Sequence, residues 1–156
     1  RLGWTWVDCD RAIEQRRGTT IRQLFEQSGE SEFRRIESEV LAELLRSPEQ
    51  VIATGGGAVL LPENRDLMRT AGPVVWLHAS AETLTKRLSR ERAAAGRPSL
   101  TGRPIHLEVA DVLAIREPLY RQAATLTVHS DGESADQVAR RIFRHLSNEV
   151  RKGRGD

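Results

Sequence analysis

The stretch Val51-Ile52-Ala53-Thr54-Gly55-Gly56-Gly57-Ala58-Val59 decides the fold class of this chain of 156 residues. A short apolar run of the kind that forms a buried strand passes directly into three consecutive glycines. Because glycine has no Cβ, the backbone N–H groups of such a loop can approach a ligand closely. A strand that ends in this way indicates the carboxyl edge of a parallel sheet, where open α/β folds bind ligands. The glycines alone are equally compatible with a flexible turn or a helix cap.

The composition is that of an ordinary globular domain. Hydrophobic residues make up 38% of the chain and charged residues 29%, and the length corresponds to one domain. No apolar run approaches the roughly 18–20 residues that a membrane span needs. The single cysteine, Cys9, excludes an internal disulfide and fits a reducing compartment. We therefore expect a cytoplasmic protein that does not act at a membrane.

The charge of the chain gives little indication of a nucleic-acid partner. The net charge is only +2, although the chain holds 22 arginines against 2 lysines. The base composition of the coding DNA accounts for most of this excess. Individual arginines can nevertheless bind a carboxylate or a phosphate with two parallel hydrogen bonds, which lysine does less well. We expect no nucleic acid among the partners and look for a few functional arginines.

Strand and helix patterns alternate along the chain. Strands are predicted over 4–7, 51–54, 73–77 and 125–128. Helices are predicted over 11–17, 20–28, 33–45, 62–70, 80–92, 107–122 and 134–150. The segment from Thr20 to Gln23 has the form of a capping box, Gly18 and Gly29 are expected to end the first two helices, Pro48 to end the third, and Pro62 to lie in the first turn of the fourth. This alternation predicts an α/β fold with a mostly parallel sheet and helices on both faces, in three αβα layers. The small, basic segment 93–104 is predicted to be a mobile lid, and the polar tail 151–156 to be flexible.

Two aspartates follow the first predicted strand. If the strand geometry persists, the side chains of Asp8 and Asp10 point to the same side. Paired carboxylates at such a position suit two tasks, holding Mg²⁺ and accepting a proton from a hydroxyl group. The alternative is a cluster that caps the helix beginning near Arg11.

Three arginines are candidates for binding anionic groups. Arg34 stands three residues before Glu37, a spacing that lets the carboxylate brace the guanidinium, although an exposed helical ion pair has the same spacing. Arg97 lies in the predicted lid, from which it can reach a transferring phosphate or remain a solvated loop charge. Arg116 precedes Pro118 in a helical pattern and can equally be a surface residue beside a kink.

Six stretches, in this order, resemble the shikimate kinase family, small relatives of the nucleoside monophosphate kinases. The resemblance extends over residues 2–148. The matching stretches are Val7-Asp8-Cys9-Asp10 with Ile13-Glu14, Thr20-Ile21 with Phe25, Gly29-Glu30 with Phe33-Arg34-Arg35-Ile36-Glu37, Ala53-Thr54-Gly55-Gly56-Gly57-Ala58-Val59, Arg97-Pro98-Ser99-Leu100, and Arg116-Glu117-Pro118-Leu119-Tyr120.

The resemblance implies a P-loop kinase-like fold and a monomer that transfers the γ-phosphate of ATP to the 3-hydroxyl of shikimate. This step belongs to chorismate and aromatic amino-acid biosynthesis. Asp10 is then the base and binds a ring hydroxyl, while Asp8 supports Mg²⁺ through water. Arg34 and Arg116 bind the shikimate carboxylate. The other implied site residues are Gly55, Gly56, Gly57, Ile21 and Phe25 in the substrate pocket, Arg97 at the phosphates and Arg87 on the adenine.

The chain departs from the family pattern in its nucleotide anchor. The family carries a phosphate-binding loop G-x-x-x-x-G-K-[ST] between its first strand and first helix, and this sequence does not contain that motif. We therefore expect that the first, central strand and the P-loop are missing from a partial sequence, so that this chain alone is inactive. The alternatives are a non-catalytic module that binds shikimate and a related small-molecule kinase such as a gluconate kinase.

Overall fold

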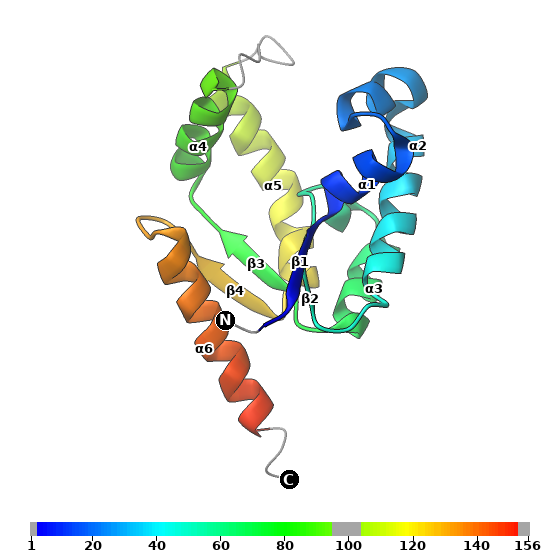
Figure 1. Cartoon of the computed structure of the whole chain (residues 1–156). Helices are drawn as coiled ribbons and strands as arrows, with labels where there is room; N and C mark the ends of the chain where they lie inside the picture. The colour runs from blue at the N-terminus through cyan, green and yellow to red at the C-terminus, as the bar shows by residue number, and fades with distance from the viewer. Residues whose placement is uncertain (1–2, 95–103, 153–156) are drawn as a thin grey trace. The chain divides into compact units, whose positions relative to one another are not determined.

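The computed structural model describes residues 3–94 and 104–152, and these residues fall into two compact units that divide after Val74. Unit 1 ends at Val74 and unit 2 begins at Val75. Figure 1 shows the order of the helices and strands along the chain. In the described part of the chain, no helix is both long enough and apolar enough to cross a membrane.

Unit 1 contains two strands, three α-helices and a single turn of 3₁₀ helix. In chain order they are β1 (Thr5–Asp8), α1 (Cys9–Arg17), α2 (Ile21–Leu44), β2 (Gln50–Ala53), η1 (Ala58–Leu60) and α3 (Pro62–Ala71). The buried apolar side chains of the unit come from α1, α2, η1 and α3. Its most buried apolar side chains are Cys9, Ile13, Leu24, Phe33, Ile36, Val40, Leu41, Ala58, Val59 and Met68.

Local sequence signals explain where the helices of unit 1 begin and end. Gly18 closes α1 with φ 63° and ψ 23°, the left-handed conformation that glycine adopts without strain. Thr20 and Gln23 form the predicted capping box at the start of α2. Gly29, predicted to break the helix, has φ 77° and ψ 174° and kinks α2 in the middle. Pro62 occupies the first turn of α3, as its fixed φ favours.

Strands β1 and β2 are parallel neighbours, with Thr5 opposite Gln50 and Asp8 opposite Ala53. Both strands therefore end at the same edge. This brings Asp8 close to Gly55-Gly56-Gly57 after β2, which we call the glycine loop. One face of this pair is open, since Trp6 is 67% exposed and its partner Val51 is 49% exposed. Because parallel sheets are normally covered on both faces, these residues mark a surface that unit 1 does not itself cover.

Unit 2 contains β3 (Val75–His78), α4 (Ala81–Ala94), α5 (Ile105–Ala123), β4 (Leu126–His129) and α6 (Ala135–Lys152). Strands β3 and β4 are parallel, with Val75 opposite Leu126. The indole of Trp76 stacks on the ring of Tyr120 from α5, at 5.7 Å between centroids. Val128 of β4 and Val138 of α6 are buried, and these two elements are in contact.

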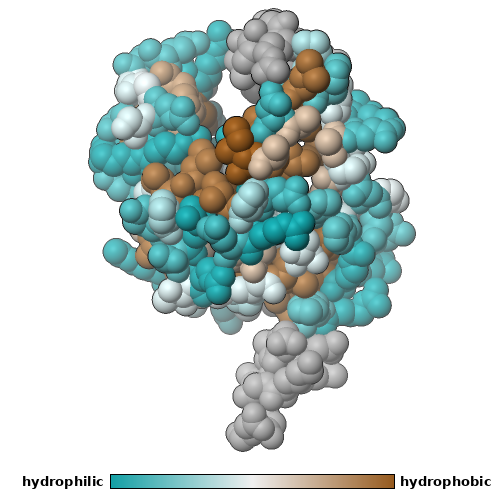
Figure 2. All heavy atoms as spheres, turned by 180° about the vertical axis from the view of Figure 1, so that it is seen from behind, coloured by the Kyte–Doolittle hydropathy of each residue, from teal (hydrophilic) through white to brown (hydrophobic). Residues whose placement is uncertain are grey.

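The four predicted strands all occur, and the predicted α/β class with parallel strands is confirmed. Among the described residues, however, they form two separate pairs, β1–β2 and β3–β4, instead of one sheet. Each strand therefore has one unpaired edge in that part of the chain. Figure 2 shows apolar side chains, in brown, exposed among the teal polar residues of one face.

Some boundaries differ from the prediction. Helix α2 ends at Leu44, before Pro48, and the residues between them form a turn. Helix α4 continues to Ala94, so the first residues of the predicted lid 93–104 are helical, while 95–103 lie outside the described residues. Helix α6 reaches Lys152, so the predicted tail 151–156 begins within a helix, and 153–156 also lie outside the description.

Candidate active site

The shared-side argument assumed that the strand continues through both aspartates, but the strand ends at the first of them. Asp8 is the last residue of β1 and also the N-cap of α1, where its Oδ1 accepts a hydrogen bond from Arg11 N at 3.1 Å. Asp10 lies in the first turn of α1. The capping alternative is therefore right for Asp8, because an aspartate at a helix start satisfies a free backbone N–H and favours the helix.

The pKa of Asp10 lies above its ordinary value of 3.8. The largest cause is the loss of water around its carboxylate, and the negative charges of Asp8 and Glu14 raise the pKa further. The guanidinium of Arg34 acts in the opposite direction. Asp10 thus keeps contact with solvent but binds a proton more tightly than an ordinary aspartate does. A raised proton affinity is the property that a base requires.

The side chain of Arg34 is held inside unit 1 by a buried carboxylate. Arg34 Nη1 donates to Glu37 Oε2 at 2.7 Å, and the two side chains are only 15% and 2% exposed. Arg34 Nη2 donates to the exposed Glu30 at 3.4 Å. The Nε of Arg34 is buried and has no hydrogen-bond partner among the described residues. Arg34 is therefore not the exposed ion pair of the alternative prediction, because its side chain is largely closed to solvent.

Two phenylalanines extend this arrangement along α2. The guanidinium of Arg34 lies 5.1 Å from the centre of the Phe33 ring, a distance typical of a cation–π contact. The buried Phe33 packs in turn against Phe25, at 4.4 Å between ring centroids. Phe25 is partly exposed, and the half-buried Ile21 lies one turn earlier on α2. Of the two predicted pocket-wall residues, Phe25 is thus linked to Arg34 through Phe33.

The glycine loop passes directly against these charged groups. A Cβ at Gly57 would lie 2.3 Å from Arg34 Nη1, and one at Gly55 would lie 3.3 Å from Asp10 Oδ1 and 3.4 Å from Glu37 Oε1. Neither glycine has the positive φ that would itself require glycine. Gly55 and Gly57 are therefore explained by close approach to the carboxylates and the guanidinium, and not by a flexible turn.

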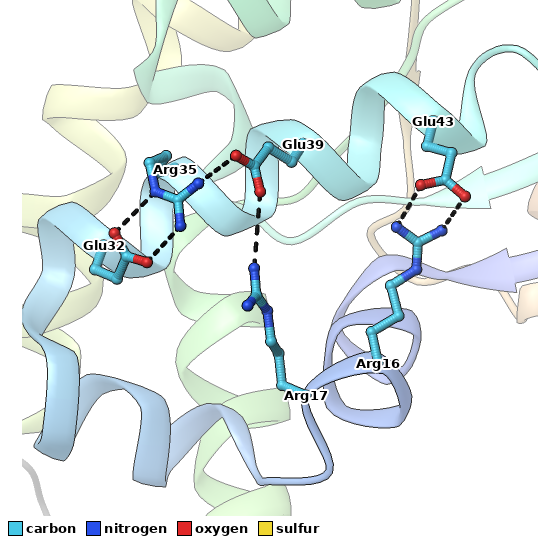
Figure 3. Close-up of polar contacts among 6 residues, drawn as sticks. All are labelled: Arg16, Arg17, Glu32, Arg35, Glu39 and Glu43. Atoms are coloured by element: carbon cyan, nitrogen blue, oxygen red, sulfur yellow. Dashed lines mark hydrogen bonds and ion pairs between the residues drawn. The ribbon is translucent and has the colours of Figure 1, made fainter.

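A set of ion pairs joins α1 to α2 (Figure 3). Arg16 of α1 binds Glu43 of α2 through two contacts, at 2.5 and 2.6 Å. Arg17 of α1 lies 3.7 Å from Glu39, which also pairs with Arg35. These contacts connect the helix that carries Asp10 to the helix that carries Arg34.

The remaining predicted residues belong to unit 2 or lie outside the described residues. Arg87 of α4 donates from Nη1 to Ser130 Oγ at 3.1 Å and from Nη2 to Ser130 O at 2.8 Å. Arg116 is half-buried on α5. Arg97 is not among the described residues. The structure thus brings together Asp8, Asp10, Arg34 and the glycine loop within unit 1, and leaves the roles of the other arginines as predictions.

The first turn of α3 contains two residues that the sequence reasoning missed. The side chains of Asn64 and Arg65 donate hydrogen bonds to backbone carbonyls of η1, directly after the glycine loop. Asparagine and arginine after a helix-starting proline are too common to be distinctive in a single sequence. Their contacts depend on how α3 packs against η1, which the sequence pattern does not specify.

The residues present fit Mg²⁺ only as part of a shared site. The described residues contain no group of three or more His, Cys, Asp or Glu side chains that could hold a metal ion. Asp8 already uses one carboxylate oxygen in its cap. Mg²⁺ in kinases commonly keeps several waters and binds one or two carboxylates together with substrate phosphates. Asp8 is compatible with such an outer position and not with a protein-only metal site.

Comparison with known proteins identifies the family. The family model described as shikimate kinase matches residues 1–147. The chain belongs to the shikimate kinase family. Shikimate kinase 2 of Yersinia pestis (strain Pestoides F) is 43% identical over 152 residues, which cover 97% of this chain and 86% of that protein. Shikimate kinase of Symbiobacterium thermophilum is 40% identical over 153 residues, which cover 98% and 87%.

Solved structures of the family have the same fold. A shikimate kinase from Acinetobacter baumannii in complex with shikimate matches with a TM-score of 0.83 and 36% identity, over 95% of this chain and 82% of that one. A shikimate kinase from Aquifex aeolicus matches with a TM-score of 0.79 and 26% identity, over 96% and 84%. These findings confirm the predicted P-loop kinase-like fold and the predicted function, an ATP-dependent kinase acting on the alcohol shikimate.

Proposed function

We propose that unit 1 forms the shikimate-binding half of this kinase and that Asp10 is its catalytic base. The observation that carries the proposal is the position of the Arg34 guanidinium, which lies against the glycine loop between a buried glutamate and the loop backbone. The carboxylate of Asp10 lies against the same loop at Gly55. A cation for the substrate carboxylate and a base for its hydroxyl thus lie against one loop.

Arg34 is suited to bind the carboxylate of shikimate because its geometry is fixed. Glu37 holds one nitrogen of the guanidinium, while 15% of the side chain remains exposed. A preorganised guanidinium loses little conformational freedom when it binds a planar carboxylate with two hydrogen bonds. We assign Arg116 as a second ligand of this carboxylate by resemblance to the family.

Asp10 is suited to accept the proton of the attacked hydroxyl. Its raised pKa makes the carboxylate a stronger base than an ordinary aspartate. The backbone of Gly55, Gly56 and Gly57 lines the pocket, and Ile21 and Phe25 form its apolar wall. Water exclusion by this wall would strengthen the charge interactions around the reacting oxygen.

We infer further that the phosphates of ATP are held by a G-x-x-x-x-G-K-[ST] loop on sequence outside these 156 residues. Two observations support this inference: the motif does not occur in the sequence, and the four described strands form two pairs with unpaired edges. A further parallel strand beside either pair would satisfy one of those edges. Mg²⁺ would be bound by the loop hydroxyl and phosphates, with Asp8 contacting it through water, while Arg87 and Arg97 contact the nucleotide.

Calorimetry tests the assignment of Arg34. Titration of shikimate into the full-length protein should show binding, and Arg34→Ala should lower the affinity by roughly ten- to a hundredfold, because a charge-assisted hydrogen bond typically contributes about 1.5–3 kcal/mol. Arg22→Ala is the matched control, since Arg22 lies on the same helix and its side chain is 83% exposed. Equal affinities of wild type and Arg34→Ala would refute the assignment.

An activity assay tests the inferred phosphate loop and the alternatives. The 156-residue chain and a version extended by a strand, the G-x-x-x-x-G-K-[ST] loop and a helix are compared for ATP-dependent phosphorylation of shikimate and of gluconate. We expect activity on shikimate from the extended protein alone, because the loop supplies positioning and charge neutralisation for phosphoryl transfer. Activity of the short chain would refute the loop inference, and a well-folded but inactive extended protein that binds shikimate would indicate a binding module.

A further inference from the structure

The glycine loop continues into a single 3₁₀ turn, η1, whose backbone needs outside partners. Ala58 N donates to Gly55 O at 3.1 Å and Leu60 N donates to Gly57 O at 3.0 Å, so the turn is directly coupled to the loop. A helix of one turn is too short to use its own carbonyl groups. Because Ala58 and Val59 are buried, donors from the protein must satisfy these carbonyls.

Two neighbouring side chains of α3 supply those donors. Asn64 Nδ2 donates to Ala58 O at 3.0 Å. Arg65 Nη1 donates to Val59 O at 2.7 Å, with a second, longer contact of 3.4 Å to Leu60 O. The three consecutive carbonyls of η1 are thus bound by the first turn of one rigid helix.

The burial of Asn64 indicates that its side-chain hydrogen bond is needed at this position. Asn64 is completely buried, and its Oδ1 has no hydrogen-bond partner among the described residues. An unpaired buried acceptor lowers stability, and an apolar side chain of similar size would avoid that loss. The donor on the same amide, which binds Ala58 O, is the contact that an apolar side chain would not provide.

Small displacements of η1 matter because the loop that it anchors has little space. At Gly57 the backbone lies so close to Arg34 that even a methyl group would overlap the guanidinium. A shift of the loop would therefore move Arg34 or open a gap beside it. Both changes alter the place where the proposed substrate carboxylate binds.

We propose that Arg65, together with Asn64, is a positioning residue of this kinase that fixes the glycine loop against Arg34 and thereby sets the affinity for shikimate. The proposal rests on the proposed function of unit 1. Neither residue needs to contact the substrate, since both act through the carbonyls of η1.

The test compares Arg65→Met, which keeps much of the apolar stem and removes the donors, with Arg65→Lys, which retains a donor. Arg69→Met on the same helix is the control, because Arg69 is exposed. Shikimate affinity is measured by calorimetry and backbone hydrogen exchange over residues 55–60 by mass spectrometry, both on the full-length protein. If Arg65→Met does not fold, Arg65→Gln takes its place under the same criteria.

We expect Arg65→Met to bind shikimate about tenfold more weakly and to exchange faster over residues 55–60, with affinity largely restored in Arg65→Lys and unchanged in Arg69→Met. Affinity for a nucleotide should stay within about twofold, since the nucleotide does not contact this loop in the proposed site. A folded Arg65→Met with wild-type shikimate affinity would overturn the proposal, even if exchange became faster. A wild type that does not bind shikimate would instead overturn the proposed function itself.

Discussion

Replacing Gly57 by alanine isolates the close approach between the glycine loop and Arg34. The backbone of Gly57 has φ −90° and ψ −13°, which alanine adopts without strain. The new methyl carbon would lie 2.3, 2.7 and 2.8 Å from Nη1, Nη2 and Cζ of Arg34. The substitution therefore leaves the loop conformation allowed and acts on the guanidinium.

The size of the effect follows from the contacts that hold the guanidinium. Carbon and nitrogen atoms need about 3.5 Å between them, so the guanidinium must retreat by about 1 Å. The Arg34–Glu37 hydrogen bond is 2.7 Å long and would be stretched or broken by such a movement. Loss of one charge-assisted contact to the substrate costs about 1.5–3 kcal/mol, or roughly a ten- to hundredfold loss of shikimate affinity.

Calorimetric titration of shikimate into wild type, Gly57→Ala and Gly72→Ala measures this effect. Gly72→Ala is the control, because a Cβ there would meet no atom within 4 Å and its backbone is extended. Gly55→Ala should give an intermediate loss, since its contacts of 3.3 and 3.4 Å with Asp10 and Glu37 are tight but not overlapping. Wild-type affinity in a folded Gly57→Ala would show that the position of Arg34 does not control binding.

Two further predictions concern ionisable groups of α1. Asp10→Asn should lower turnover of the full-length enzyme by about 10²–10⁴-fold, because an amide cannot accept the proton. The wild-type rate should fall as pH falls through the raised pKa of Asp10. Near-normal turnover of Asp10→Asn would exclude Asp10 as the base. Burial, with the charges of Glu37 and Asp10, raises the pKa of Cys9 from 9.0 to about 12. The unfolded thiol therefore ionises first, and the free energy of unfolding should fall above about pH 9 by up to about 1.4 kcal/mol per pH unit. Urea unfolding between pH 8 and 10.5 should show a shallower decline for Cys9→Ala, and parallel declines would contradict the raised pKa.

The sequence predicted those features of the fold that depend on neighbouring residues. Thr20 with Gln23, Gly18, Gly29 and Pro62 carry their capping, turning or helix-starting signals within a few positions, and the structure has each of them where it was expected. The pairing of strands could not be read in the same way. Which strand edges meet depends on partners distant in the sequence, so the division into β1–β2 and β3–β4 appears only in the structure.

The candidate site was predicted in its residue types and less well in its environment. The spacing of Arg34 and Glu37 indicated an ion pair, but spacing alone does not distinguish an exposed pair from one that is nearly closed to solvent. Asp10 was expected at a strand end, whereas the cap formed by Asp8 starts the helix earlier. Arg65 carries no sequence signal, since its acceptors are backbone carbonyls whose positions depend on tertiary packing.

The ion pairs between α1 and α2 determine how this part of the protein should respond to heat and salt. All of their cations are arginines, which stay charged at any ordinary pH. Exposed pairs contribute about 0–1 kcal/mol each at room temperature. Because the desolvation cost of ions decreases on warming, while added salt screens them, the α1–α2 joint should persist during moderate heating and loosen at high ionic strength. Concentrated salt should therefore change the spacing of Asp10 and Arg34 more than moderate heating does.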